Sequence, residues 1–411
     1  MTIAPHSKYA VWFVFITVLL DMVGFGLIMP VQPALIESVA HVDVGTAGLI
    51  GSFMFFAFSG AQFLSGPTLG NLSDAIGRRP MLLLAVFGLG CDYLITALAP
   101  SIGWLFVGRT LAGVCGASYV IANAFIADVT PPEGRAKAFG LMGAAFGLGF
   151  VIGPAIGGLL GTFGPRVPFF VASAFSLLNF VFGYFILPET LPKEKRRAFD
   201  WKRANPLGTL RIFAQYRQVL PLCGVLFIYF FATAVYPAIW PFWGSAKFGW
   251  SPATIGITLA VFGVITAVTQ GVLTGPLVKR YGEWRMAVVG MIAAPIGCLF
   301  FFAAPSLIWV LIGALVHAPE GFTHPMLTAI MSKEVPEDAQ GELQGGMSSI
   351  MNISMMLGTV FYGFAFQYFV DPNPIFQSAS AGFAISSILM ICALLLALTY
   401  ARPPKELLRS T

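Results

Sequence analysis

The chain has 411 residues, of which 57% are hydrophobic and only 10% are charged, and its formal net charge is +5. Soluble domains carry about 25% charged residues, so a water-soluble fold is excluded and the lipid bilayer must be the solvent for most of the surface. The excess of positive charge is not the footprint of a nucleic-acid partner, because its distribution follows membrane topology. The five cysteines fall in apolar segments without a CxxC pair, so we expect neither disulfides nor metal ligands among them.

Hydrophobic runs of about 20 residues predict twelve membrane-spanning helices. We place them near 9–33, 45–68, 81–99, 103–126, 137–161, 167–187, 218–241, 252–276, 286–303, 306–330, 346–369 and 376–400. The polar stretch 188–217 divides them six and six. We therefore expect an all-α membrane protein with an N-terminal half (1–187), a basic cytoplasmic linker (188–217) and a C-terminal half (218–411). The charged linker itself is interpreted as a solvated connector.

The distribution of Lys and Arg predicts the orientation of these spans. With the N-terminus inside, 20 of the 23 Lys and Arg residues fall on the cytoplasmic side. The exceptions are Arg109, Arg166 and Lys247. The positive-inside rule then places both termini in the cytoplasm.

Four ionisable residues lie inside the predicted spans: Asp21, Asp92, Arg109 and Glu320. An ionisable group within a bilayer is costly, so each is a candidate for a proton or ion relay. A buried guanidinium needs a carboxylate partner, and Asp21 and Asp92 are the acids available in the N-terminal spans. One of them should meet Arg109. We prefer Asp21 with Arg109 as the switching pair, with Asp92 gating or tuning access.

The tenth predicted span carries His317, Glu320 and His324. Offsets of three and four place the carboxylate near both histidines on one helix face, and Pro319 and Pro325 loosen the backbone ladder there. Three titratable groups together favour a functional role over simple packing. Zinc binding is a minor alternative, because the spacing is not diagnostic of a metal site.

Two loops at equivalent places, 70–80 and 275–283, form a weak internal repeat that indicates duplicated halves rocking around a midplane site. The first loop reads Gly-x-Leu-x-Asp-x-x-Gly-Arg-Arg-Pro and resembles the signature loop of the major facilitator superfamily. The resemblance implies that Asp74 pairs with a base or a helix end. The family usually has a basic residue where Ala75 stands, which leaves Arg78 and Arg79 as the partners. We expect Asp128 to join this cytoplasmic cluster.

Two further motifs extend the resemblance. Residues 108–117 in the fourth span resemble the superfamily's membrane-embedded Arg motif. In the fifth span, Gly149, Gly153, Pro154 and Gly157 look like the motif of the drug/proton antiporter branch. That motif implies export, and its role would be geometric, letting spans of the two halves approach and part.

Across most of the chain the resemblance narrows to the tetracycline/proton antiporters. It is carried by residues 21–33, the pair Asp92-Tyr93, and residues 251–263 and 340–345. Gln62 and Gln270 fall where that family places polar groups facing the drug path. The chain departs from the family at two coupling positions, with Ala294 replacing an acid in span nine and Thr266 replacing a histidine in span eight. Tetracycline and the family's coupling route are therefore not carried over wholesale.

Aromatic residues of span seven are the remaining candidates for a substrate cavity. Tyr236 and Trp240, with His317, are assigned to it, although interfacial anchoring is the alternative for such residues.

The resulting expectation is proton-coupled efflux of an amphipathic organic molecule by alternating access, without a cofactor or metal beyond the proton gradient. Glu320 with His324 would be the titrating site of the C-terminal half. The expected protein is a monomer of the bacterial inner membrane and not an enzyme, because its loops hold no nucleophile–base constellation. An uptake symporter or uniporter on the same fold is the alternative function.

Overall fold

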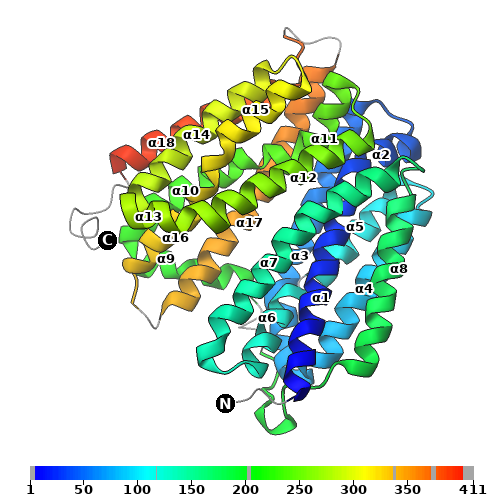
Figure 1. Ribbon diagram of the computed structural model, residues 1–411, viewed down its shortest axis with the longest axis vertical. Coiled ribbons are helices and arrows are strands. Elements are labelled where there is room, and N and C mark those ends of the chain that lie inside the picture. Colours follow the sequence, from blue (N-terminus) through cyan, green and yellow to red (C-terminus); the bar gives the residue numbers. More distant parts are fainter. Residues whose placement is uncertain (1–4, 117, 201–204, 337–338, 372–375, 401–411) are drawn as a thin grey trace. The chain divides into compact units, whose positions relative to one another are not determined.

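The computed structural model describes residues 5–116, 118–200, 205–336, 339–371 and 376–400. All regular elements within these ranges are helical, as expected (Figure 1). The chain divides into two compact units, each with its own apolar core. Residues 43–56 belong to the second unit and residues 250–260 to the first, so the units differ from the two sequence halves at these segments.

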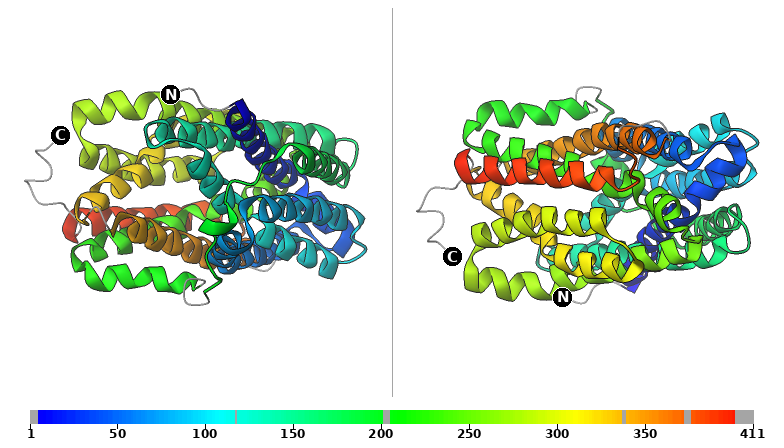
Figure 2. Two further views of the ribbon diagram at one scale, coloured as in Figure 1. Left: turned by 90° about the horizontal axis from the view of Figure 1, so that it is seen from below. Right: turned by 90° about the horizontal axis from the view of Figure 1, so that it is seen from above.

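The first unit holds the N-terminal helices. Its elements are α1 (Pro5–Ile28), η1 (Met29–Val31), α2 (Gln32–Ala40), most of α3 (Val44–Ile76), α4 (Arg78–Leu98), α5 (Ile102–Gly116), α6 (Ser118–Val129), α7 (Pro132–Gly161), α8 (Val167–Ile186) and η2 (Lys193–Lys195). Helix α1 packs along α7, and α4 packs along α8, as the views in Figures 1 and 2 agree. Phe13, Val14 and Phe125 lie at the centre of this core and are almost fully buried.

The second unit holds the C-terminal helices. Its elements are η3 (Pro206–Arg211), α9 (Ile212–Gln215), η4 (Arg217–Val219), α10 (Leu220–Thr233), α11 (Val235–Phe248), the end of α12 (Pro252–Val268), η5 (Thr269–Leu273), α13 (Thr274–Tyr281), α14 (Glu283–Ala303), α15 (Leu307–His317), η6 (Ala318–Phe322), α16 (Thr323–Lys333), α17 (Gln340–Val370) and α18 (Ala381–Tyr400). Helix α14 packs against α15, η6, α16 and α18. The segment η5 is a single π turn within an otherwise α-helical span.

The predicted count of twelve spans is confirmed in part. In the described part of the chain, eleven helical stretches are long and apolar enough to cross a membrane. The predicted tenth span is divided into α15, η6 and α16, each too short on its own. Pro319 lies in the 3-10 segment η6, where its ring and missing N–H interrupt the α-helical ladder. Pro325 lies in the first turn of α16, where proline is tolerated.

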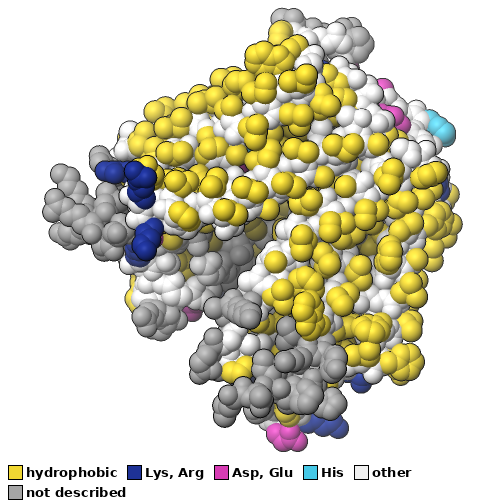
Figure 3. All heavy atoms as spheres, in the orientation of Figure 1, with side chains coloured by type: hydrophobic (Ala, Val, Ile, Leu, Met, Phe, Trp, Pro, Cys, Tyr) yellow, Lys and Arg dark blue, Asp and Glu magenta, His cyan; other side chains and the backbone are white. Residues whose placement is uncertain are grey.

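The surface carries the pattern expected of a protein in lipid. Figure 3 shows hydrophobic side chains over most of the visible face, with charged side chains near the ends of helices. Large apolar side chains such as Phe185 and Phe163 are more than 70% exposed. The expected cytoplasmic position of both termini falls on residues 1–4 and 401–411, which lie outside the described residues.

Candidate functional site

The buried guanidinium of Arg109 on α5 forms its ion pair with Asp92 on α4. The Arg109 Nη2 and Asp92 Oδ2 atoms are 3.1 Å apart, and the two residues are 7% and 0% exposed. Thr96 donates a second hydrogen bond to Asp92 at 3.3 Å. Gly108 makes room for this pair, because a Cβ there would lie 2.8 Å from Asp92 Oδ1. Of the two acids that could meet Arg109, Asp92 thus forms an ion pair with it, and the switching role preferred for Asp21 stays a prediction.

Sequence spacing contained a signal for the observed pair. Helices α4 and α5 are joined by a turn at Pro100 and Ser101. Asp92 lies eight residues before Pro100, and Arg109 lies eight residues after Ser101. Antiparallel neighbours joined by so short a turn place such positions at the same depth in the membrane.

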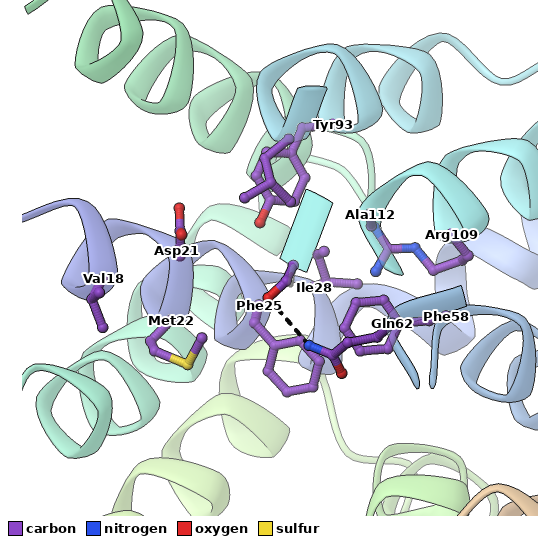
Figure 4. Close-up of a pocket in the computed structure, with 12 residues that line it drawn as sticks. Val18, Asp21, Met22, Phe25, Ile28, Phe58, Gln62, Tyr93, Arg109 and Ala112 are labelled. Atoms are coloured by element: carbon purple, nitrogen blue, oxygen red, sulfur yellow. Dashed lines mark hydrogen bonds between the residues drawn. The ribbon is translucent and has the colours of Figure 1, made fainter. Parts of the chain in front are cut away.

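Asp21 lies with Arg109 on one small cavity inside the first unit. The cavity has a volume of about 50 Å³, and its polar lining is provided by Asp21, Gln62, Tyr93 and Arg109. Figure 4 shows these side chains coming from α1, α3, α4 and α5. Tyr93 reaches the cavity across Gly24, where a Cβ would collide with the Tyr93 ring. Polar cavities of this size hold water molecules.

This cavity is too small to hold a drug-sized molecule, so the substrate role predicted for Gln62 stays a prediction. Drug-sized ligands occupy about 300–1,000 Å³, several times the observed volume. The Gln62 side chain donates from Nε2 to the carbonyl of Gly116 at 3.3 Å and so bridges α3 and α5. Gln62 therefore lies beside the charged residues rather than in a drug-sized space.

The glycines of α7 lie against two helices. A Cβ on Gly149, Gly153 or Gly157 would come within 3.0 Å of α1, and at Gly153 and Gly157 it would meet α1 backbone atoms. Pro154 lies inside α7, between these contacts, and packs beside Gly26 of α1. These three glycines therefore approach α1 of the same sequence half closely, whereas the Pro154 carbonyl lies against Gly256 of α12, a helix of the predicted C-terminal half. The conformational role of the motif stays a prediction.

The other face of α7 carries two more glycines. Gly158 lies against Pro252 and Ala253, and Gly161 lies against the Pro252 side chain, at the beginning of α12. Residues 250–260 are part of the first compact unit. The glycine motif thus joins α1 and the first turns of α12 to α7.

The signature loop forms the predicted cytoplasmic cluster in part. Arg78 is paired with Asp74 at 2.6 Å and with Asp128 at 3.3 Å. Arg79 lies elsewhere: its Nη2 donates to the Tyr184 carbonyl at 2.6 Å, and its guanidinium lies over the Tyr184 ring. Gly77 has a φ of +123°, a backbone conformation that residues other than glycine rarely adopt.

Part of the linker is hydrogen-bonded to this loop at Glu189, Arg197 and Asp200, although most of its described side chains between 190 and 200 are exposed. Glu189 accepts hydrogen bonds from the backbone N–H of Arg78 at the first turn of α4, at 3.0 Å. The backbone N–H of Arg197 donates to the Asp74 carbonyl, and the Asn71 side chain donates to the Asp200 carbonyl. An acid at a helix N-terminus is stabilising. Glu189 follows the sixth predicted span after Pro188, but its partner lies 111 positions away in the sequence.

In the second unit, His317 and Glu320 come together, but His324 does not complete a triad. Glu320 Oε2 lies 4.0 Å from His317 Nε2. The ring of His324 packs on Phe230, with centroids 5.2 Å apart. In a 3-10 segment such as η6, residues i and i+3 are eclipsed whereas i+4 is rotated away. Within the described ranges, no group of three or more His, Cys, Asp or Glu side chains is placed to hold a metal ion.

Two tyrosines that the sequence did not single out as partners complete this pair. Tyr229 of α10 donates a hydrogen bond to Glu320. Tyr236 of α11 lies within hydrogen-bond distance of His317 Nε2, at 3.0 Å. The other ring nitrogen of His317 is 3.3 Å from the Ala294 carbonyl.

The residues assigned to a substrate cavity in span seven belong to an aromatic cluster, and their role as cavity walls stays a prediction. Tyr236 and Trp240 pack among Phe262, Phe301 and Phe383, with the Trp240 and Phe301 rings 5.2 Å apart. Trp240 and His317 are each 2% exposed. Gln270 lies on the exposed π turn η5. Its side chain lies near η6, because a Cβ built at Gly321 would be 3.3 Å from the Gln270 side chain.

Membrane-length helices that enclose a buried ion pair and a water-sized charged cavity define a membrane transporter rather than a simple anchor. The chain belongs to the major facilitator superfamily, whose profile matches residues 14–237 and 221–411. It is 39% identical over 344 residues to the class C tetracycline resistance protein of Escherichia coli, covering 83% of this chain and 86% of the relative. It is 30% identical to multidrug resistance protein 2 of Bacillus subtilis, covering 88% and 89%.

Solved structures share the fold. The human organic anion transporter MFSD10 is 25% identical, with a TM-score of 0.68, and the match covers 95% of this chain and 99% of that one. A bacterial homologue of the human lysosomal transporter Spinster is 16% identical with a TM-score of 0.79, covering 98% of each chain. At 16% identity, the similarity to the Spinster homologue shows a shared fold alone.

Proposed function

We propose that this protein exports an amphipathic organic molecule of the tetracycline type from the cytoplasm in exchange for protons. The observation that carries the proposal is the shared cavity of Asp21, Tyr93 and Arg109 within the first unit. Carboxylates inside a membrane mark proton pathways in pumps and transporters. The similarity to tetracycline resistance proteins supports the class of substrate. The protein would act as a monomer in a bacterial inner membrane with both termini in the cytoplasm.

The first unit offers a division of labour between its two acids. Asp92 is fully buried and neutralises Arg109, so it holds the guanidinium in place. Asp21 is partly exposed and lines the water-sized cavity, where a proton can reach it. Protonation of Asp21 would remove a negative charge beside Arg109. This would change the free-energy difference between the inward-facing and outward-facing conformations, and so shift the equilibrium between them.

The second unit offers a site for the coupling that the family places elsewhere. The tetracycline antiporters have an acid where this chain has Ala294, and His317 reaches the Ala294 carbonyl. Glu320 then lies beside His317 and accepts from Tyr229. A titratable pair therefore occupies the neighbourhood of the missing acid, and we propose that it takes over that role.

The export proposal is tested with inverted membrane vesicles. In inverted vesicles the cytoplasmic face of the protein points outward and meets the added drug. Tetracycline should therefore accumulate inside the vesicles when their interior is made more acidic than the medium, because protons leave in exchange for the drug. Accumulation should disappear when a protonophore collapses the gradient. Uptake that is independent of the pH gradient, or that occurs only in right-side-out vesicles, would contradict proton-coupled export.

Replacing Glu320 by Gln should lower the number of protons moved per substrate while leaving expression similar, because glutamine keeps the hydrogen bond of Tyr229 but cannot release a proton. Proteoliposomes with a pH dye and labelled drug give this ratio. His324→Ala is the matched variant, since its ring contacts Phe230 and should leave the ratio unchanged. An unaltered ratio of protons to substrate in Glu320→Gln would contradict the proposal that the second unit contains a coupling site.

A further inference from the structure

The second unit carries a groove that the transport proposal does not use. It lies between the η5–α13 segment, α14 and the α15–η6 segment, and has a volume of about 570 Å³. We call it the π-turn groove. Its lining is apolar over most of its length and includes Leu273, Leu277, Val289, Leu315 and Phe322. Three of these, Leu273, Val289 and Leu315, are 44–63% exposed, so the groove is open along its side.

The groove exists because two neighbouring spans are distorted at one level. Residues Thr269–Leu273 form a π turn, and the Thr274 hydroxyl donates to the Thr269 carbonyl at 3.0 Å. The facing segment η6 is a 3-10 helix and packs against η5. Nothing lies within 4 Å of a Cβ built at Gly271 or Gly275. π turns of this kind are frequent at functional sites.

One end of the groove is basic. Arg285 lines it and is exposed, and Lys279 and Arg280 occupy the last turn of α13 beside it. The nearby acid Glu283 is held by Lys333 at 2.8 Å, so it does not cancel these charges. Figure 3 shows Lys and Arg side chains gathered where α13 meets α14. The charge pattern predicts that this end faces the cytoplasm.

We propose that the π-turn groove binds one anionic phospholipid of the cytoplasmic leaflet. The phosphate of the headgroup would lie at Arg285, with Lys279 and Arg280 nearby, and an acyl chain would lie along Leu277, Leu273 and Leu315. The combination of a basic end and a long apolar side matches the two parts of a lipid. A free phosphate ion would leave the apolar length uncovered.

The test is lipid binding to the purified, delipidated full chain, measured by native mass spectrometry. Phosphatidylglycerol should bind more tightly than phosphatidylcholine with the same acyl chains. Arg285→Gln should weaken phosphatidylglycerol binding about fivefold, the equivalent of about 1 kcal/mol for one basic residue at an anionic lipid. Arg217→Gln is the control, because Arg217 is an exposed basic residue on η4 that does not line the groove.

A second variant separates the lipid from its headgroup. Leu273→Trp keeps every basic residue but fills the groove, so it should reduce phosphatidylglycerol binding without changing the net charge. Glycerol phosphate should compete poorly with the lipid. Equal binding of the two lipids, equal effects of Arg285→Gln and Arg217→Gln, or undiminished binding in Leu273→Trp would each overturn the proposal, because ordinary lipid around the protein predicts those results.

Discussion

Asp21→Asn is expected to insert and fold like the unaltered protein but to lose proton-driven drug accumulation, falling to the level of vesicles without a pH gradient. Asparagine is close to aspartate in size and can form hydrogen bonds at the same place, but it carries no proton that can be released. Asp21 lines the small cavity with Tyr93 and Arg109. If its proton is the one exchanged, the variant is locked in the neutral state.

Two measurements make this result specific to proton exchange. Glu194→Gln applies the same chemical change to an exposed residue of the linker and should transport normally. Exchange of labelled for unlabelled drug without a gradient should persist in Asp21→Asn, because that half-reaction needs no net proton movement. Normal pH-driven accumulation by the variant would contradict the role given to Asp21.

The positions of the spans were predictable because the thickness of a bilayer demands about 20 apolar residues per crossing. Observed helices lie in each of the twelve predicted ranges, although the last helix begins at Ala381 rather than near residue 376. The local helix type within the tenth predicted span was harder to predict from the sequence. Pro319 and Pro325 indicated a weakened ladder, yet they do not specify that residues 318–322 form a 3-10 segment. That detail decides which histidine meets Glu320.

Contacts between spans were predictable only where the chain itself brings the helices together. Asp92 and Arg109 lie on successive antiparallel helices at equal distances from their turn, and this spacing could have identified the pair. The docking of Glu189 on the start of α4 crosses 111 positions of sequence, and no local pattern encodes it. The same holds for the tyrosines that contact His317 and Glu320, because they come from α10 and α11.

The Asp92–Arg109 pair gives the second large expected effect, on folding rather than on transport alone. Arg109→Gln leaves the fully buried Asp92 carboxylate without its guanidinium, and Asp92→Asn leaves the guanidinium without its carboxylate. Removing one partner of a buried ion pair costs about 3–5 kcal/mol, because an uncompensated charge remains. Each single variant should therefore give less folded protein and a lower midpoint of thermal unfolding in detergent.

The double variant Asp92→Asn with Arg109→Gln should recover much of that stability, because no buried charge is left without its partner and two amides can hydrogen-bond to each other. Its transport should remain low, since Arg109 would no longer provide positive charge beside Asp21. The coupling energy from the double-mutant cycle isolates the pair. Additive losses in the double variant would show that Asp92 and Arg109 stabilise the protein independently. Restored transport would show that the pair is structural, and Arg109 would then have no part in the proton-binding site around Asp21.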